Sequence, residues 1–240
     1  YDEAINLNPS YSDAYHNRGT TRSALKDFEG AIDDFDQSII FDPDNVITYC
    51  NRGAIKQELK DFAGAITDFS KAINLDTKHT AAYNGRAIVK ILTGDLGGAI
   101  NDYNISISLD PKNAKAYYHR GGAKQGLKDF TGAIADYNAA INLDPQDYDA
   151  YNNRGAAKRN LNDFEGAIKD YNEAINLNPK YALAYNTRGI VKKKMGDLEG
   201  AIKDYTKAIE LDPLDPRFYH NRALAKKSLG DLEGAAKDTA

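Results

Sequence analysis

Two cations and one aspartate recur together along this chain, in a pattern that could form ion pairs or capture an anion. In one copy Lys158 follows Arg154 by four residues and Asp170 follows it by sixteen. The arginines are Arg18, Arg52, Arg86, Arg120, Arg154, Arg188 and Arg222, and the aspartates are Asp34, Asp68, Asp102, Asp136, Asp170, Asp204 and Asp238. The second cations are Arg22, Lys56, Lys90, Lys124, Lys158, Lys192 and Lys226.

Residues of opposite sign at a constant spacing favour pairing within the protein. Arg154 and Lys158 share a face if they lie on one helix, and Asp170 would lie on the antiparallel partner. We expect structural ion pairs of this kind at Arg18–Asp34, Arg52–Asp68, Arg154–Asp170 and Arg188–Asp204. The alternative is that the arginines line a groove and await an acidic ligand.

A row of mostly amide side chains lies just after a recurring tyrosine and could bind a peptide. The candidate residues are Asn17, Asn51, Asn84, His119, Asn153, Asn186 and Asn221. An amide carries two donors and an acceptor, so exposed amides could satisfy an extended peptide backbone whatever its sequence. The alternative interpretation is a polar, solvated surface.

Four further cations indicate what charge such a peptide would carry. Arg159, Lys193, Lys194 and Lys227 lie in the later part of the chain, where residues 121–240 hold 18 Lys and Arg against 18 Asp and Glu. Residues 1–120 hold 13 against 17. This placement favours an acidic peptide segment. A pI near 5.6 argues against nucleic acid as the partner.

Residues for enzymatic or metal chemistry lack the necessary grouping. The four histidines (His16, His79, His119 and His220) are scattered, and neither a His-Glu-x-x-His run nor a Gly-x-x-x-x-Gly-Lys loop occurs. We therefore expect no catalytic residues, no metal and no cofactor. The single Cys50 cannot form an internal disulfide, which favours a reducing, cytoplasmic location.

A 34-residue period predicts the secondary structure that carries these residues. Prolines occupy Pro9, Pro43, Pro111, Pro145, Pro179 and Pro213, and Thr77 stands at the one vacant point of this grid. Such self-similarity indicates a solenoid of stacked units. The grid divides residues 1–240 into a partial unit 1–11, repeats 12–45, 46–79, 80–113, 114–147, 148–181 and 182–215, and a partial unit 216–240.

Each unit is predicted to be a pair of antiparallel helices. In repeat 148–181 the first helix should span about residues 148–161 and the second about 164–177. Asp163 is placed to cap the second helix, and Pro179 should end it. At Thr77, where the proline is missing, we expect the end of the second helix to be less sharply defined. Two columns of small residues, represented by Gly155 and Gly166, should let paired helices approach closely.

The repeat resembles the tetratricopeptide repeat family over essentially the whole chain. The matching residues are Tyr151, Arg154, Gly155, Ala167, Tyr171, Ala174 and Pro179. Arginine occupies the column where the family usually has leucine. The resemblance implies an all-α, right-handed superhelical solenoid whose first helices line a concave groove. There the amide row is similar to the asparagine ladder of the O-linked N-acetylglucosamine transferases.

The expected function is a protein-interaction scaffold that binds an extended, acidic peptide or partner segment in this groove. One alternative is a substrate-recruiting arm of a larger enzyme, with the chain a segment of a longer protein. Another is head-to-tail self-assembly, because Tyr1–Leu7 matches the end of a second helix and 232–240 its beginning. No apolar run approaches the ~20 residues of a membrane helix, so we expect no membrane insertion.

Overall fold

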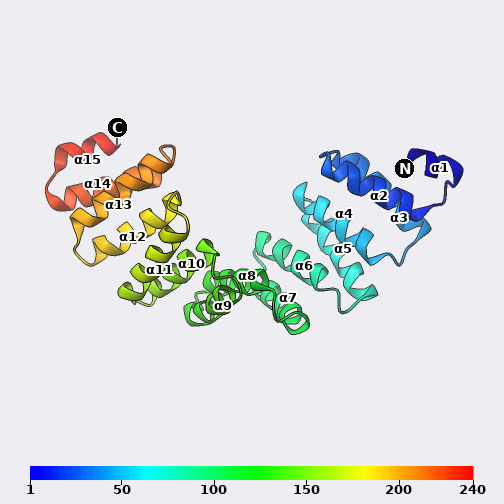
Figure 1. Cartoon of the computed structure of the whole chain (residues 1–240), viewed down its shortest axis with the longest axis horizontal. Coiled ribbons are helices and arrows are strands. Elements are labelled where there is room, and N and C mark those ends of the chain that lie inside the picture. The colour runs from blue at the N-terminus through cyan, green and yellow to red at the C-terminus, as the bar shows by residue number, and fades with distance from the viewer. Residues whose placement is uncertain (240) are drawn as a thin grey trace. The chain divides into compact units, whose positions relative to one another are not determined.

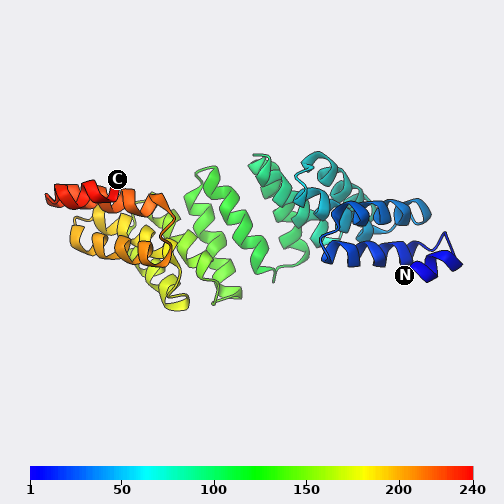
Figure 2. The same cartoon turned by 90° about the horizontal axis from the view of Figure 1, so that it is seen from above.

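The computed structural model describes residues 1–239, and within these residues the chain is all-helical, with fifteen α-helices and no strand (Figures 1 and 2). The helices are α1 (Asp2–Leu7), α2 (Ser12–Ala24), α3 (Phe28–Phe41), α4 (Val46–Glu58), α5 (Phe62–Leu75), α6 (Thr80–Leu92), α7 (Leu96–Leu109), α8 (Ala114–Gly126), α9 (Phe130–Leu143), α10 (Tyr148–Asn160), α11 (Phe164–Leu177), α12 (Ala182–Lys194), α13 (Leu198–Leu211), α14 (Pro216–Leu229) and α15 (Leu232–Thr239).

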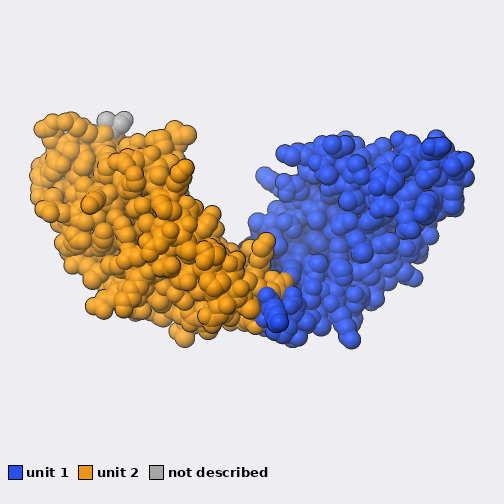
Figure 3. All heavy atoms as spheres, in the orientation of Figure 1, with its two compact units in different colours: residues 1–112 blue, residues 113–240 orange. Residues whose placement is uncertain are grey.

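These helices form two compact units. Unit 1 comprises Tyr1–Lys112 and contains α1 to α7, and unit 2 comprises Asn113–Ala240 and contains α8 to α15 (Figure 3). Within each unit consecutive helices pair as hairpins, such as α2 with α3 and α10 with α11. The predicted helices of repeat 148–181 agree with α10 and α11 to within one residue.

An aspartate starts the second helix of every hairpin. The Asp163 carboxylate accepts a hydrogen bond from the Gly166 backbone N–H at 2.9 Å, and the equivalent bonds elsewhere measure 2.8–3.1 Å. Each such cap contributes about 1 kcal/mol to helix stability.

The two glycine columns have different physical causes, whereas close helix approach had been predicted for both. A Cβ at Gly155 would lie 2.8 Å from the Tyr171 ring of the partner helix, so this glycine does permit close approach. A Cβ at Gly166 would instead overlap the Asp163 carboxylate. The second column is therefore required by the cap rather than by helix packing.

The vacant proline position leaves the extent of its helix unchanged. Helix α5 ends at Leu75, and the Asp76 carboxylate accepts from the Lys78 backbone N–H at 2.9 Å in the following turn. This Asx-type turn can end a helix without proline, because the side chain supplies a local acceptor.

The core joins one repeat to the next inside each unit. Ala167 and Tyr171 of α11 pack against Val191 of α12, and Ala133 and Tyr137 of α9 pack against Ala157 of α10. Because these contacts repeat along the chain, the first helices of neighbouring repeats are held side by side. We call their shared surface the first-helix face: α2, α4 and α6 in unit 1, and α8, α10, α12 and α14 in unit 2.

Candidate functional site

The arginine column lies inside a dense ionic network between the paired helices. Arg154 donates from Nε to Asp170 Oδ2 at 2.9 Å and from Nη2 to Asp170 Oδ1 at 2.6 Å. Lys158 Nζ lies 2.8 Å from Asp170 Oδ2. The Asp170 side chain is 5% exposed, so two cations neutralise a carboxylate that has been removed from water. The pairs Arg18–Asp34, Arg52–Asp68 and Arg188–Asp204 have the same arrangement.

Each of these arginines also contacts the preceding repeat. Arg154 Nη1 donates to Asn138 Oδ1 on α9 at 2.7 Å, which ties three helices together. The corresponding acceptors are Asp2 for Arg18, Asp36 for Arg52, Ser70 for Arg86, Asn172 for Arg188 and Thr206 for Arg222. These acceptors were not predicted, although an oxygen-bearing residue sixteen positions before each arginine is a signal in the sequence that indicates them.

This geometry argues against the alternative that the arginines bind an acidic ligand. All three nitrogens of Arg154 donate to protein oxygens, and its guanidinium lies 5.2 Å from the centre of the Tyr151 ring. Hydrogen bonding to Asp34 raises the pKa of Arg18 above its ordinary value, as expected for a cation stabilised by a carboxylate. The network therefore joins helices and repeats.

The amide row is less exposed than expected, and its side chains hydrogen-bond each other. Asn186 is 5% exposed, and its Oδ1 accepts from Asn221 Nδ2 at 2.8 Å. Asn153 Nδ2 donates to the Tyr118 hydroxyl at 2.9 Å. Each of these bonds joins neighbouring first helices, so part of the bonding capacity expected for a peptide is used within the protein.

The remaining members of the row differ in setting. Asn17 is exposed, whereas Asn51, Asn84 and His119 are half-buried. The His119 ring packs edge-on against Tyr118 with ring centres 5.2 Å apart, and burial lowers the pKa of His119. Asn51 lines a pocket of unit 1 together with residues of α2, α3 and α4.

The predicted cationic residues lie on the first-helix face of unit 2. Arg159, Lys193 and Lys227 occupy the same repeat position in the last turns of α10, α12 and α14. Lys194 is the next residue of α12, and its Nζ lies 5.6 Å from the centre of the Phe164 ring. Within the described residues these four side chains, and Lys115 on α8, form no ion pair. Lys115 was not among the predicted cationic residues.

An apolar hollow lies between two of the helices that carry these cations. A pocket of about 560 Å³ between α12 and α14 is lined by Leu183, Ile190 and Pro216 together with the polar side chains of Asn186, Thr187 and Asn221. Thr187 Oγ1 donates to Asn152 Oδ1 at 2.9 Å, which fixes the polar side of this surface. The sequence did not predict this pocket, because it depends on how two first helices from different repeats pack against each other.

The described residues 1–239 contain no helix long and apolar enough to cross a bilayer. Over the same residues, His, Cys, Asp and Glu side chains form no group of three or more that could hold a metal ion.

Family models match most of the chain. A model described as "TPR repeat" matches residues 89–127, 127–160, 155–196 and 191–230. Two models described as "Tetratricopeptide repeat" match residues 1–33 and 47–79. A search of curated proteins gave no significant match.

Solved structures share the fold at low sequence identity. A tetratricopeptide repeat protein from Parabacteroides merdae has a TM-score of 0.78 and 20% identity, covering 95% of this chain and 90% of its own. MamA from Desulfovibrio magneticus has a TM-score of 0.66 and 20% identity, with coverage of 70% and 95%. YrrB, described as a TPR protein with an unusual peptide-binding site, has a TM-score of 0.67 and 21% identity, with coverage of 80% and 97%.

Proposed function

Because the chain belongs to the tetratricopeptide repeat family, whose fold is typical of protein-interaction scaffolds, we propose that unit 2 binds an extended acidic segment of a partner protein. The segment lies on the first-helix face of α10, α12 and α14. Its carboxylates meet the cations in the last turns of these helices, and an apolar side chain enters the pocket between α12 and α14.

The observation that carries this proposal is the set of unpaired cations. Arg188 and Lys192 of α12 are both paired with Asp204, but Lys193 and Lys194 are left without a carboxylate among the described residues. On the first helices of unit 2 only Asp149 opposes these charges, and it accepts a hydrogen bond from Tyr181 rather than from a cation. The surface therefore has a positive excess that a carboxylate-rich segment would neutralise.

Cations in the last turn of a helix also stabilise that helix through its dipole. That role explains one cation at each helix end, but it does not explain why α12 carries three. The dipole contribution is also local, so it predicts no effect on peptide binding. The two roles can therefore be separated by experiment.

The test is a selection of random 12-residue peptides displayed on phage against immobilised protein. We expect the selected peptides to be rich in Asp and Glu around an apolar residue. Lys193→Glu combined with Lys227→Glu should weaken their binding by at least about tenfold, and salt should weaken binding to the unaltered protein.

The matched control is Lys169→Glu combined with Lys203→Glu, which makes the same change of net charge on the second helices α11 and α13. Binding should change little in this control. The proposal fails if the selected peptides show no acidic enrichment, or if the control loses as much affinity as the test variant.

A further inference from the structure

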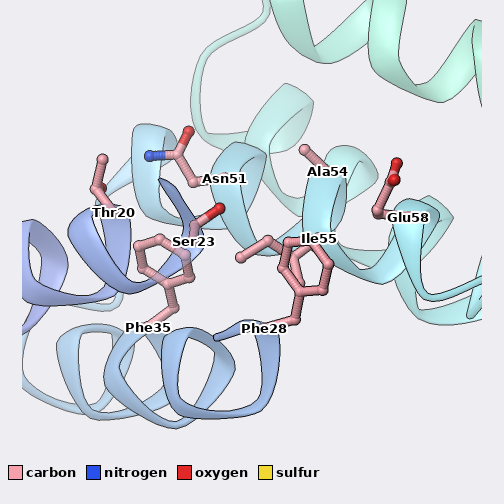
Figure 4. A pocket seen from close by; sticks show the side chains of 8 residues that line it. All are labelled: Thr20, Ser23, Phe28, Phe35, Asn51, Ala54, Ile55 and Glu58. Carbon is pink, nitrogen blue, oxygen red and sulfur yellow. The ribbon is translucent and has the colours of Figure 1, made fainter. Parts of the chain in front are cut away.

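A second pocket lies in unit 1, outside the surface used above. It has a volume of about 330 Å³, within the range of ligand-binding pockets, and lies between α2 and α4 above α3 (Figure 4). The rings of Phe28 and Phe35 rise from α3 and form its floor with Ile55 of α4, while Thr20, Ser23 and Asn51 stand around it (Figure 4).

A short side chain at Ser23 contributes to the opening, because every other repeat has a larger residue at that position, such as Gln57 in the second repeat. Thr20 and Ala54 are also shorter than Ile88, their equivalent in the third repeat. In repeat 114–147 the equivalents of Phe35 and Ser23 are Tyr137 and Gln125, and the Tyr137 hydroxyl donates to Gln125 Oε1 at 3.3 Å. The polar bridge that spans this position in repeat 114–147 is therefore absent from the pocket in unit 1.

The charge around this pocket is opposite to that of unit 2. All six cations on α2, α4 and α6 are paired with aspartates, namely Arg18 and Arg22 with Asp34, Arg52 and Lys56 with Asp68, and Arg86 and Lys90 with Asp102. Glu58 lines the pocket and has no ion-pair partner among residues 1–239. The charge left unpaired at the pocket is therefore negative.

We infer that this pocket binds an aromatic side chain of a partner segment, with a neighbouring lysine or arginine of that segment facing Glu58. Two phenylalanine rings in the floor favour a third ring, because aromatic rings pack edge-to-face and offset. Glu58 attracts the adjacent cation, and Asn51 can hydrogen-bond the peptide backbone. This site is independent of the acidic segment proposed for unit 2, since it differs in helices, residues and charge preference.

The experiment uses protein labelled with ¹³C at isoleucine methyl groups and three probe peptides: acetyl-Lys-Phe-Lys-amide, acetyl-Glu-Phe-Glu-amide and acetyl-Lys-Ala-Lys-amide. A bound ring would shift the Ile55 methyl signal through its ring current. We expect a saturable Ile55 shift with Lys-Phe-Lys, binding about fivefold weaker or more with Glu-Phe-Glu, and no such shift with Lys-Ala-Lys.

Two variants separate the contribution of the pocket to peptide binding from the contribution of the Glu58 charge. Thr20→Ile combined with Ser23→Gln fills the pocket with side chains that the chain itself carries at equivalent positions, and it should weaken Lys-Phe-Lys binding at least about tenfold. Glu58→Gln leaves the pocket open and should abolish the preference for Lys-Phe-Lys over Glu-Phe-Glu. The inference is overturned if Ile55 responds to no peptide, if the filled variant binds as well as the parent, or if Glu58→Gln keeps the full preference.

Discussion

At the scale of single residues, the main feature is a nearly buried carboxylate that two cations share. Removing one partner of such a group leaves an uncompensated charge, which costs about 3–5 kcal/mol when the site is buried. Arg154 itself is only partly buried, with 16% of its side chain exposed, so solvent can relieve part of the penalty when Asp170 is lost. We therefore expect the loss of Asp170 to cost less than this range for a fully buried site.

A double-mutant cycle on this pair tests the network. Asp170→Ala and Arg154→Ala should each lower the free energy of unfolding, and the double variant should cost less than the sum of the two. We expect a coupling energy of about 1–3 kcal/mol from urea denaturation. A coupling near zero would show that the contact contributes nothing to stability.

The same network predicts sensitivity to acid at Asp238. Burial alone would raise the pKa of this carboxyl, but hydrogen bonds from Arg222 and Lys226 outweigh it and hold the pKa below its ordinary value of 3.8. A lowered pKa in the folded state gives stability that is present above pH 3.8 and is lost as the pH falls through the folded-state pKa.

The measurement is unfolding free energy against pH for the parent and for Asp238→Asn. The variant should be less stable than the parent near neutral pH, and the difference should shrink below pH 3.8. A difference that stays constant down to the lowest pH at which the protein is folded would contradict this assignment.

At the scale of helices, the turn inside each hairpin requires one residue with positive φ. Lys60 has φ of 62°, whereas Gly94 and Gly196 occupy the same position in other repeats with φ of 85° and 87°. The left-handed conformation costs a residue with a Cβ about 1–2 kcal/mol, and glycine avoids this cost. Part of that gain is cancelled because glycine is more flexible in the unfolded chain.

Lys60→Gly should therefore stabilise the protein by roughly 0.5–1 kcal/mol, measured as a higher urea midpoint. The matched control is Gly94→Lys, which should lower stability by a similar amount. Equal midpoints for both variants and the parent would mean that these turns carry no strain.

At the scale of the whole molecule, the repeats are joined by arginines that contact two of them at once. Arg188→Lys keeps a positive charge opposite Asp204. The lysine lacks the planar guanidinium that lets Arg188 donate to Asp204 and Asn172 at the same time. We expect faster amide hydrogen exchange in α11 and α12, by about tenfold, because the contact between neighbouring repeats is weakened. Exchange confined to the residues next to Arg188 would instead indicate a purely local role.

The periodic features of the fold could be predicted from the sequence, whereas contacts set by the rotation between repeats could not. The grid of Pro145 and Pro179 places α10 and α11 correctly because helix ends depend on local turn and cap chemistry. Asn186 was expected to be exposed but is buried, because its partner Asn221 is 35 residues away on a neighbouring helix. No local pattern determines how two such helices face each other.

The hydrogen bond from each arginine to the preceding repeat also affects how the number of repeats could change. Every described acceptor for this contact (Asp2, Asp36, Ser70, Asn138, Asn172 and Thr206) carries a side-chain oxygen. Each 34-residue repeat therefore carries an arginine that contacts the repeat before it. It also carries an acceptor for the arginine of the repeat after it. If one whole repeat is duplicated or deleted, each arginine still lies next to an acceptor in the preceding repeat. If the chain is joined after half a repeat, the arginine lies next to a helix that lacks this acceptor. Recombination between repeats can thus lengthen or shorten the array without requiring a new contact between neighbouring repeats.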